Sequence, residues 1–189
     1  MADFEKFGFY IINAEYLKYL HQNDSEVYYN QTNHTLKKPF IGIVVGLGEY
    51  KYFIPMTSAK EKHIKWKNIS ETHFLLYELV DKECNIANQI YKNFSEKKKM
   101  HLLSVLDIKK MVPVPEGAYE FIDFKQFEDI RYRKLFEKEY DFCLQIQEKI
   151  LTKAEKLYDN QISSGVVRKM HCDFKRLEQV SEKWKANNK

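Results

Sequence analysis

The chain has 189 residues, and its 31 lysines and arginines against 27 aspartates and glutamates give it a net charge of +4. This length fits one domain, and no apolar run approaches the ~20 residues that span a membrane, so no membrane association is expected. The three cysteines (Cys84, Cys143 and Cys172) are widely spaced, which excludes a disulfide framework and a cysteine-rich zinc site; with the polar N-terminus they favour the cytoplasm.

Residues 1–123 are predicted to be rich in strands. Asn13 is the expected N-cap of a helix from Ala14 to about His21, because its side chain can accept hydrogen bonds from free backbone amides. The polar stretch 22–36 predicts a loop, and residues 86–94 predict a short helix. Apolar and β-branched runs predict strands at residues 7–12, 40–45, 50–56, 72–80, 100–106 and 111–114. The second and third of these strands are expected to form a hairpin.

Residues 124–189 are predicted to form long helices. One helical face, with apolar residues at three- and four-residue steps, comprises Phe136, Tyr140, Cys143, Gln147, Ile150, Ala154 and Leu157. Residues 160–165 break this helix, and Ser163 or Ser164 is the expected start of a second, whose packing face comprises Val167, Met170, Phe174, Leu177 and Trp184. The pattern indicates one α+β domain, with an antiparallel, partly open β-barrel or sheet and long C-terminal helices packed on it.

The segment Thr57-Ser58-Ala59-Lys60, where the third run ends, carries the strongest chemical signal. Two hydroxyls can donate to a phosphate, and the lysine ammonium can neutralise its charge. Between residues 57 and 67 there are four lysines and one glutamate, with Trp66 among them. Positive charge beside an aromatic ring suits an RNA backbone with an unstacked base, although such a run also suits a plain solvated surface.

No metal or cofactor is expected. The six histidines form no H-E-x-x-H pattern, and Gly46-Leu47-Gly48 lacks the third glycine of a dinucleotide-binding turn. RNA cleavage needs neither, because the 2′-hydroxyl of RNA can attack the adjacent phosphorus. The protein then has to orient the backbone, stabilise the charge on the phosphate oxygens and assist proton transfer.

Several blocks resemble the ToxN/AbiQ family of type III toxin–antitoxin toxins. They lie in the family's order and spacing over nearly the whole chain, at residues 9–12, 15–20, 38–44, 52–60, 111–115 and 172–178. The resemblance implies a metal-independent endoribonuclease with a Kid/MazF-like barrel. It also implies inhibition by a small repeated pseudoknot RNA, which the toxin processes and which captures it in a closed protein–RNA ring. Cellular or phage RNA would be the substrate, and abortive infection the role.

By the same resemblance, Thr57, Ser58 and Lys60 handle the scissile phosphate, and Lys38 is a nearby basic residue of the catalytic site. The family tends to have a tyrosine shortly before the position of Lys38, where this chain has His34. Tyr28, Tyr29 or His34 could fill that role. The residues expected to bind RNA are Tyr16, Tyr29, His34, Lys62, Lys65, Trp66 and Lys67.

The sequence thus predicts an endoribonuclease toxin that works without a metal. One alternative is a non-catalytic RNA-binding module that uses the same basic face. Another is an interaction protein whose long helices form a protein interface.

Overall fold

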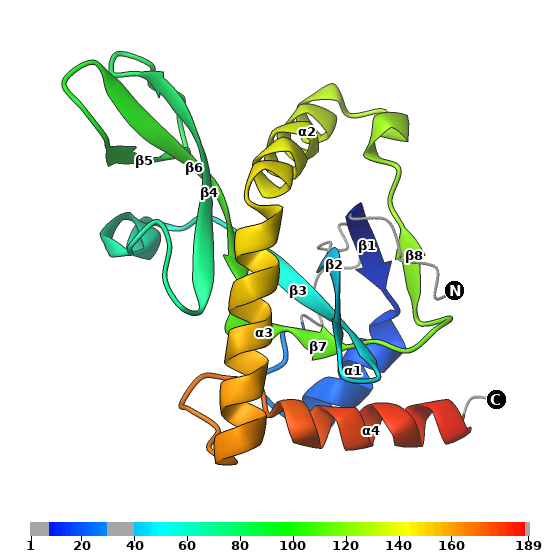
Figure 1. Ribbon diagram of the computed structural model, residues 1–189. Coiled ribbons are helices and arrows are strands. Elements are labelled where there is room, and N and C mark those ends of the chain that lie inside the picture. Colours follow the sequence, from blue (N-terminus) through cyan, green and yellow to red (C-terminus); the bar gives the residue numbers. More distant parts are fainter. Residues whose placement is uncertain (1–7, 30–39, 188–189) are drawn as a thin grey trace.

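Strands come first in the chain and the longer helices follow, in a computed structural model that describes residues 8–29 and 40–187 (Figure 1). The strands are β1 (Gly8–Ile12), β2 (Phe40–Leu47), β3 (Tyr50–Ser58), β4 (His73–Asp81), β5 (Ile90–Asn93), β6 (Lys98–Asp107), β7 (Val112–Pro113) and β8 (Tyr119–Phe121). The α-helices are α1 (Ala14–Asn23), α2 (Ile130–Gln145), α3 (Gln147–Ser164) and α4 (Phe174–Asn187). Short 3₁₀ helices are η1 (Glu61–Lys65), η2 (Ile108–Lys110) and η3 (Phe124–Gln126).

The strands form a curled antiparallel sheet in the order β4-β6-β3-β2-β1-β8, with β5 added on β6 and β7 on β3. Strand β3 joins its two halves, because residues 50–55 pair with β2 whereas residues 56–58 pair with β6. Pro55 lies where the partner changes, and proline has no amide hydrogen to donate to a ladder. The predicted α+β class, with a partly open sheet and C-terminal helices, is confirmed.

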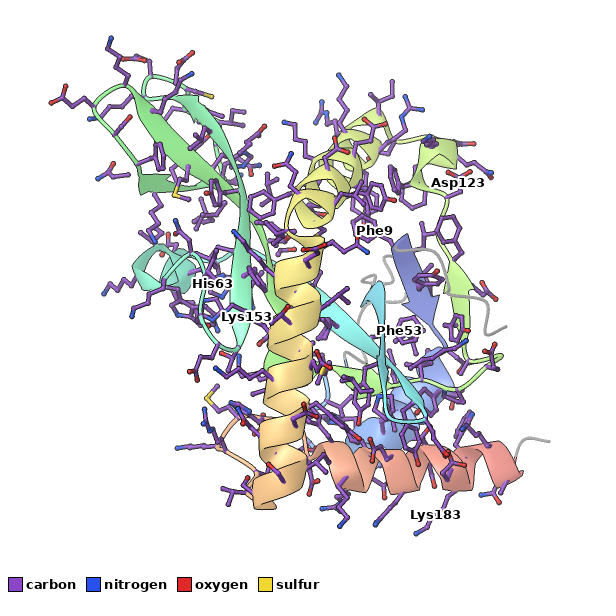
Figure 2. The ribbon with its side chains drawn as sticks, in the orientation of Figure 1. Phe9, Phe53, His63, Asp123, Lys153 and Lys183 are labelled. Carbon is purple, nitrogen blue, oxygen red and sulfur yellow. The ribbon has the colours of Figure 1, made fainter. Side chains whose placement is uncertain are left out.

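The β4–β6 half of the sheet is covered differently on its two sides. Helix η1 lies on one side and helix α2 on the other (Figure 1). A small apolar cluster that includes Leu75 and Val105 packs against Trp66, while the main core lies between the sheet and the helices. Figure 2 shows His63 of the η1 side separated by β4 from Phe9 and Phe53 of the main core.

Two predicted helix features are confirmed, and one is corrected. The Asn13 side chain accepts a hydrogen bond from the Tyr16 amide at 3.1 Å, so α1 begins as expected. The predicted face of the next helix is buried except at the half-buried Tyr140 and Gln147, but two helices share it. The chain leaves helical geometry at Ile146 (φ −112°, ψ 13°), so α2 ends there and α3 begins.

The start predicted for the last helix was wrong. The hydroxyls of Ser163 and Ser164 donate to carbonyls one turn back within α3, which ends at Gly165 with φ 66°. Helix α4 begins only after Asp173, whose carboxylate accepts from the Arg176 amide at 3.0 Å. Residues 165–173 form a connecting loop, in which the predicted packing residues Val167 and Met170 are 41% and 58% exposed.

The short helix predicted at residues 86–94 was also wrong. Ile90–Asn93 form strand β5, which pairs with residues 99–102 of β6. One or two turns of helix cannot offset the cost of helix nucleation in a short segment, and the edge of β6 offers backbone partners instead. Among the described residues, no helix is long and apolar enough to cross a membrane.

Candidate functional site

Thr57, Ser58 and Lys60 lie at the end of β3, as the sequence predicted for a strand that leads into a basic segment. Thr57 pairs with Val105 and Ser58 with Ser104, and the Ala59 amide still donates to the Leu103 carbonyl at 3.2 Å. Thr57 is half-buried, while Ser58 and Lys60 are exposed. Because successive strand residues face opposite sides, Thr57 shares its side with Val105, and Ser58 shares the other with Ser104.

His63 holds the turn that carries Lys60. The Lys60 amide donates to Nδ1 of His63 at 2.9 Å, and the His63 amide donates to the Lys60 carbonyl at 2.8 Å. Since a backbone amide can only donate, Nδ1 is unprotonated and the proton of the neutral ring is on Nε2. Burial lowers the pKa of His63, and the charges of Lys62 and Lys60 lower it further. The neutral ring therefore keeps the lysine turn in place at neutral pH.

Trp66 is the centre of the basic, aromatic surface beside this turn. Its ring centroid lies 4.6 Å from the rings of both His63 and His73. The ammonium groups of Lys62 and Lys109 each lie 5.8 Å from the ring centroid, within the range of a cation–π contact. Both predicted partners of RNA, a cation and a partly accessible aromatic ring, therefore meet here.

A buried carboxylate on the same side of the sheet was not predicted from the sequence. Asp107 is 3% exposed and accepts hydrogen bonds from the Tyr28 hydroxyl at 2.7 Å and from the Lys109 ammonium at 2.6 Å. It lies two residues beyond Val105, so it faces the side of Thr57. Burial and the neighbouring Asp107 raise the pKa of Tyr28 well above its usual range, which keeps the hydroxyl protonated.

His73 completes this group, since it pairs with Asp107 across the β4–β6 ladder. Its Nε2 donates to the Lys67 carbonyl at 2.9 Å, and its Nδ1 lies 2.8 Å from the Ser70 hydroxyl. Burial lowers the pKa of His73, and the charge of Lys109 lowers it further against the opposing effect of the Lys67 carbonyl and of Asp107. The neutral ring holds the Lys67 backbone against the strand end.

The other predicted residues are distributed unevenly. Lys62, Lys65 and Lys67 are exposed around Trp66. Tyr16, by contrast, is fully buried, and its hydroxyl donates to the Pro113 carbonyl at 2.5 Å, so it packs the fold and offers no surface to RNA.

Tyr29 lies against the ring of His21, 5.6 Å between centroids, rather than beside Asp107. Lys38 and His34 lie outside the described residues.

A second buried carboxyl lies on the opposite side of the sheet. Glu139 of α2 is 3% exposed, and burial raises its pKa from 4.5 to about 7, while the nearby Ser104 hydroxyl opposes the rise. Ser104 pairs with Ser58, so this carboxyl lies behind the strand end that carries the predicted site.

Together, these groups can bind an anionic chain and stabilise added charge on a phosphate. The lysines supply positive charge, the hydroxyls of Thr57 and Ser58 can donate hydrogen bonds, and Trp66 offers a surface for a base. Within residues 8–29 and 40–187, no three His, Cys, Asp or Glu side chains gather as metal ligands.

Comparison with known proteins assigns the chain to a family. The sequence model described as Toxin ToxN, type III toxin–antitoxin system, matches residues 8–182. Endoribonuclease ToxN of Bacillus thuringiensis subsp. kurstaki is 25% identical over 95% of this chain and 85% of its own length. Endoribonuclease AbiQ of Lactococcus lactis subsp. lactis is 29% identical over 90% of this chain and 85% of its own length.

Solved structures agree with this assignment. One, from work on a processed non-coding RNA that regulates a bacterial antiviral system, has a TM-score of 0.72 at 25% identity and covers 91% of this chain and 95% of that one. Another, of AbiQ, a lactococcal anti-phage endoribonuclease of a type III system, has a TM-score of 0.71 at 26% identity and covers 95% and 98%. The chain therefore belongs to the ToxN family of type III toxin–antitoxin toxins.

Proposed function

We propose that this chain acts, as one domain, as an endoribonuclease toxin that cleaves RNA without a metal. The 2′-oxygen of the substrate bonds to the adjacent phosphorus and loses its proton. The bond from phosphorus to the 5′-oxygen breaks, that oxygen takes up a proton, and a 2′,3′-cyclic phosphate remains. The observation that carries the proposal is the Thr57–Lys60 segment at a strand end, in a family whose relatives are named endoribonucleases.

Each group has a role in this proposal. Lys60 and the Thr57 hydroxyl, on the side of Trp66, stabilise the negative charge that grows on the non-bridging oxygens, and the Ser58 hydroxyl donates from the other side of the strand end. Trp66 stacks on a base, and Lys62, Lys65 and Lys67 bind the backbone around it. Lys38 and His34 are included on the family resemblance alone.

Tyr28 is the better candidate for the family tyrosine in this proposal. Its hydroxyl is fixed on Asp107, which also holds Lys109 beside Trp66. Tyr29 instead packs on His21. In this proposal Tyr28, held through Asp107 on the side of Thr57, contacts the RNA strand that passes over Trp66.

The reaction is tested with single-stranded RNA in EDTA. Lys60→Ala is expected to slow cleavage by about 10²–10³-fold, the usual cost of removing one group that stabilises the transition state. Lys149→Ala removes an exposed lysine on α3 and serves as the matched control, with cleavage at the wild-type rate. Cleavage by Lys60→Ala at that same rate would sink the site, and a strict Mg²⁺ requirement would sink the mechanism. RNA binding without products would instead support a non-catalytic module.

We also propose that a small pseudoknot RNA inhibits this toxin in a closed ring of alternating protein and RNA. One similar structure, with a TM-score of 0.69 and 26% identity, comes from work on selective toxin inhibition by a non-coding RNA pseudoknot. These RNA partners would place the activity in the cytoplasm, where it would act against phage. Native mass spectrometry of the co-expressed complex tests the ring, since open complexes of one protein and one RNA contradict it.

A further inference from the structure

The loop between α3 and α4 borders a hollow that none of the groups above uses. The hollow has a volume of ≈ 170 Å³ and is lined in part by Asn160, Val166, Arg168 and His171. A cavity volume of about 10–15 Å³ already holds one water molecule, so this hollow admits a much larger group. The loop is tied to the site described above, because the Cys172 amide donates to the Lys109 carbonyl at 3.0 Å.

His171 is a buried polar side chain in the wall of this hollow. It is 8% exposed, and its backbone amide donates to the Arg168 carbonyl at 3.1 Å. Its ring nitrogens, however, make no hydrogen bond to any residue that the structure describes. The enclosed polar atoms without a partner among the described residues are the Ser104 and Ser181 hydroxyls, so solvent reaches the ring nitrogens of His171 and a polar ligand in the hollow can bond to them.

The charges around His171 indicate that this ligand is an anion. Burial lowers the pKa of His171, and the cations of Lys109 and Arg168 lower it further. Asp107 opposes them, and Lys110 adds to them more weakly. Arg168 is 60% exposed on its side chain, and its contact with Glu71, at 3.5 Å, is also exposed. Such surface pairs contribute little, so the guanidinium is available to an anion.

We propose that the hollow is an RNA-phosphate subsite, in which Arg168 and His171 bind one phosphodiester of the strand that also passes the Trp66 surface. This proposal rests on the proposed function, because it takes RNA as the ligand. Arginine presents a planar fork of donors that matches two phosphate oxygens, and a protonated imidazole adds a third donor. Asn160 and the exposed Val166 offer an amide and an apolar surface to the attached base.

The decisive measurement is the binding of a 12-nucleotide 2′-O-methyl RNA, which has no free 2′-hydroxyl and cannot be cleaved. Arg168→Gln is expected to raise Kd about five- to ten-fold at 50 mM salt. It should also reduce the slope of log K against log salt by ~0.7, the value for one phosphate contact on a single strand.

Arg131→Gln is the matched control, because Arg131 is an exposed arginine at the other end of the helical layer. Arg131→Gln should leave both the Kd and the slope of log K against log salt within about two-fold of the wild-type values. Equal effects of the two substitutions would overturn the subsite.

A second arm tests His171 through pH. Bound phosphate favours the imidazolium form of His171. Lowering the pH from 8 to 6 should therefore tighten RNA binding by the wild type at least about three-fold more than it tightens binding by His171→Gln. The same pH dependence in both proteins contradicts the role of His171. If His171→Gln does not fold, the Arg168 arm decides alone. The binding assay does not depend on cleavage, because this RNA cannot be cleaved. If the protein binds it at the hollow but cleaves no ordinary single-stranded RNA, the proposed reaction is wrong and the subsite stands.

Discussion

Asp107 and Glu139 are equally buried carboxyl groups on opposite sides of the same part of the sheet, yet their surroundings differ. Each is 3% exposed. Asp107 accepts hydrogen bonds from the Tyr28 hydroxyl and the Lys109 ammonium. Glu139 has the Ser104 hydroxyl nearby, and its pKa rises to about 7 because burial penalises its charge. Equally buried carboxyl groups therefore differ in their partners, which are a tyrosine and a lysine at Asp107 and a serine at Glu139.

Asp107 and Glu139 also have different roles in the molecule. On the side of Thr57, Asp107 holds Lys109 beside Trp66 and accepts a hydrogen bond from Tyr28, so it organises the candidate RNA surface. On the side of Ser58, Glu139 joins α2 to the sheet without an ion pair of its own among the described residues. We expect substitutions at the first carboxyl to change both stability and RNA binding, and substitutions at the second to change the pH dependence of stability.

The largest expected effect comes from Asp107→Asn. It leaves the Lys109 ammonium, whose side chain is 12% exposed, without its anion. Breaking a buried pair from one side costs about 3 kcal/mol of unfolding free energy, to be measured by urea denaturation. Adding Lys109→Met should recover at least half of this loss, because both charges are then absent. A double variant that loses the full sum of the single losses contradicts the pairing.

Glu139 is tested through pH. Its folded pKa of about 7 lies above the 4.5 of the exposed group, so the folded state binds more protons between these values. Stability should therefore fall as pH rises from about 4.5 to 7, by roughly 2–3 kcal/mol, and then level off. Urea denaturation at pH 5 and pH 8 should show that Glu139→Gln removes this part of the decrease. An unchanged decrease in the variant rules out Glu139 as its source.

Much of the fold was predictable because it follows local patterns. The β2–β3 hairpin, the Asn13 cap and the buried face of α2 and α3 each depend on residues close in sequence. The errors came from competition between signals. Ser163 and Ser164 have the chemistry of an N-cap, but their hydroxyls bond back within α3, and Asp173 takes the role ten residues later.

The candidate site was predictable only in part, for a similar reason. Thr57, Ser58, Lys60 and Trp66 lie in one short segment, so spacing alone brought them together. Tyr28 and Asp107 are 79 residues apart and meet only through the fold. In the sequence, residues 107–110 were interpreted only as the connection between the predicted strands at 100–106 and 111–114. A charged residue at the end of a strongly apolar strand is the signal that could have marked Asp107.

Tyr28→Phe removes one of the two donors to Asp107 and has a smaller expected effect. The hydroxyl is part of a tyrosine that is 37% exposed, so its loss should cost about 1 kcal/mol of unfolding free energy. Tyr29→Phe is the matched control, since its ring packs on His21. It should change stability by less than about 0.5 kcal/mol. Equal losses in the two variants would show that the hydroxyl bond to Asp107 contributes nothing measurable.

The smallest effect is expected from Ser104→Ala, which tests the hydroxyl beside Glu139. The Ser104 hydroxyl favours the ionised form of Glu139, so its removal should raise the pKa of Glu139 above about 7 while stability changes by less than about 1 kcal/mol. Carbon-13 NMR of the labelled carboxyl follows this titration directly. Ser181→Ala, at a serine that is 1% exposed beside Tyr16, is the control and should leave the midpoint unchanged. A downward shift in Ser104→Ala would mean that the hydroxyl favours the protonated carboxyl, and would contradict its role as a donor to the ionised form of Glu139.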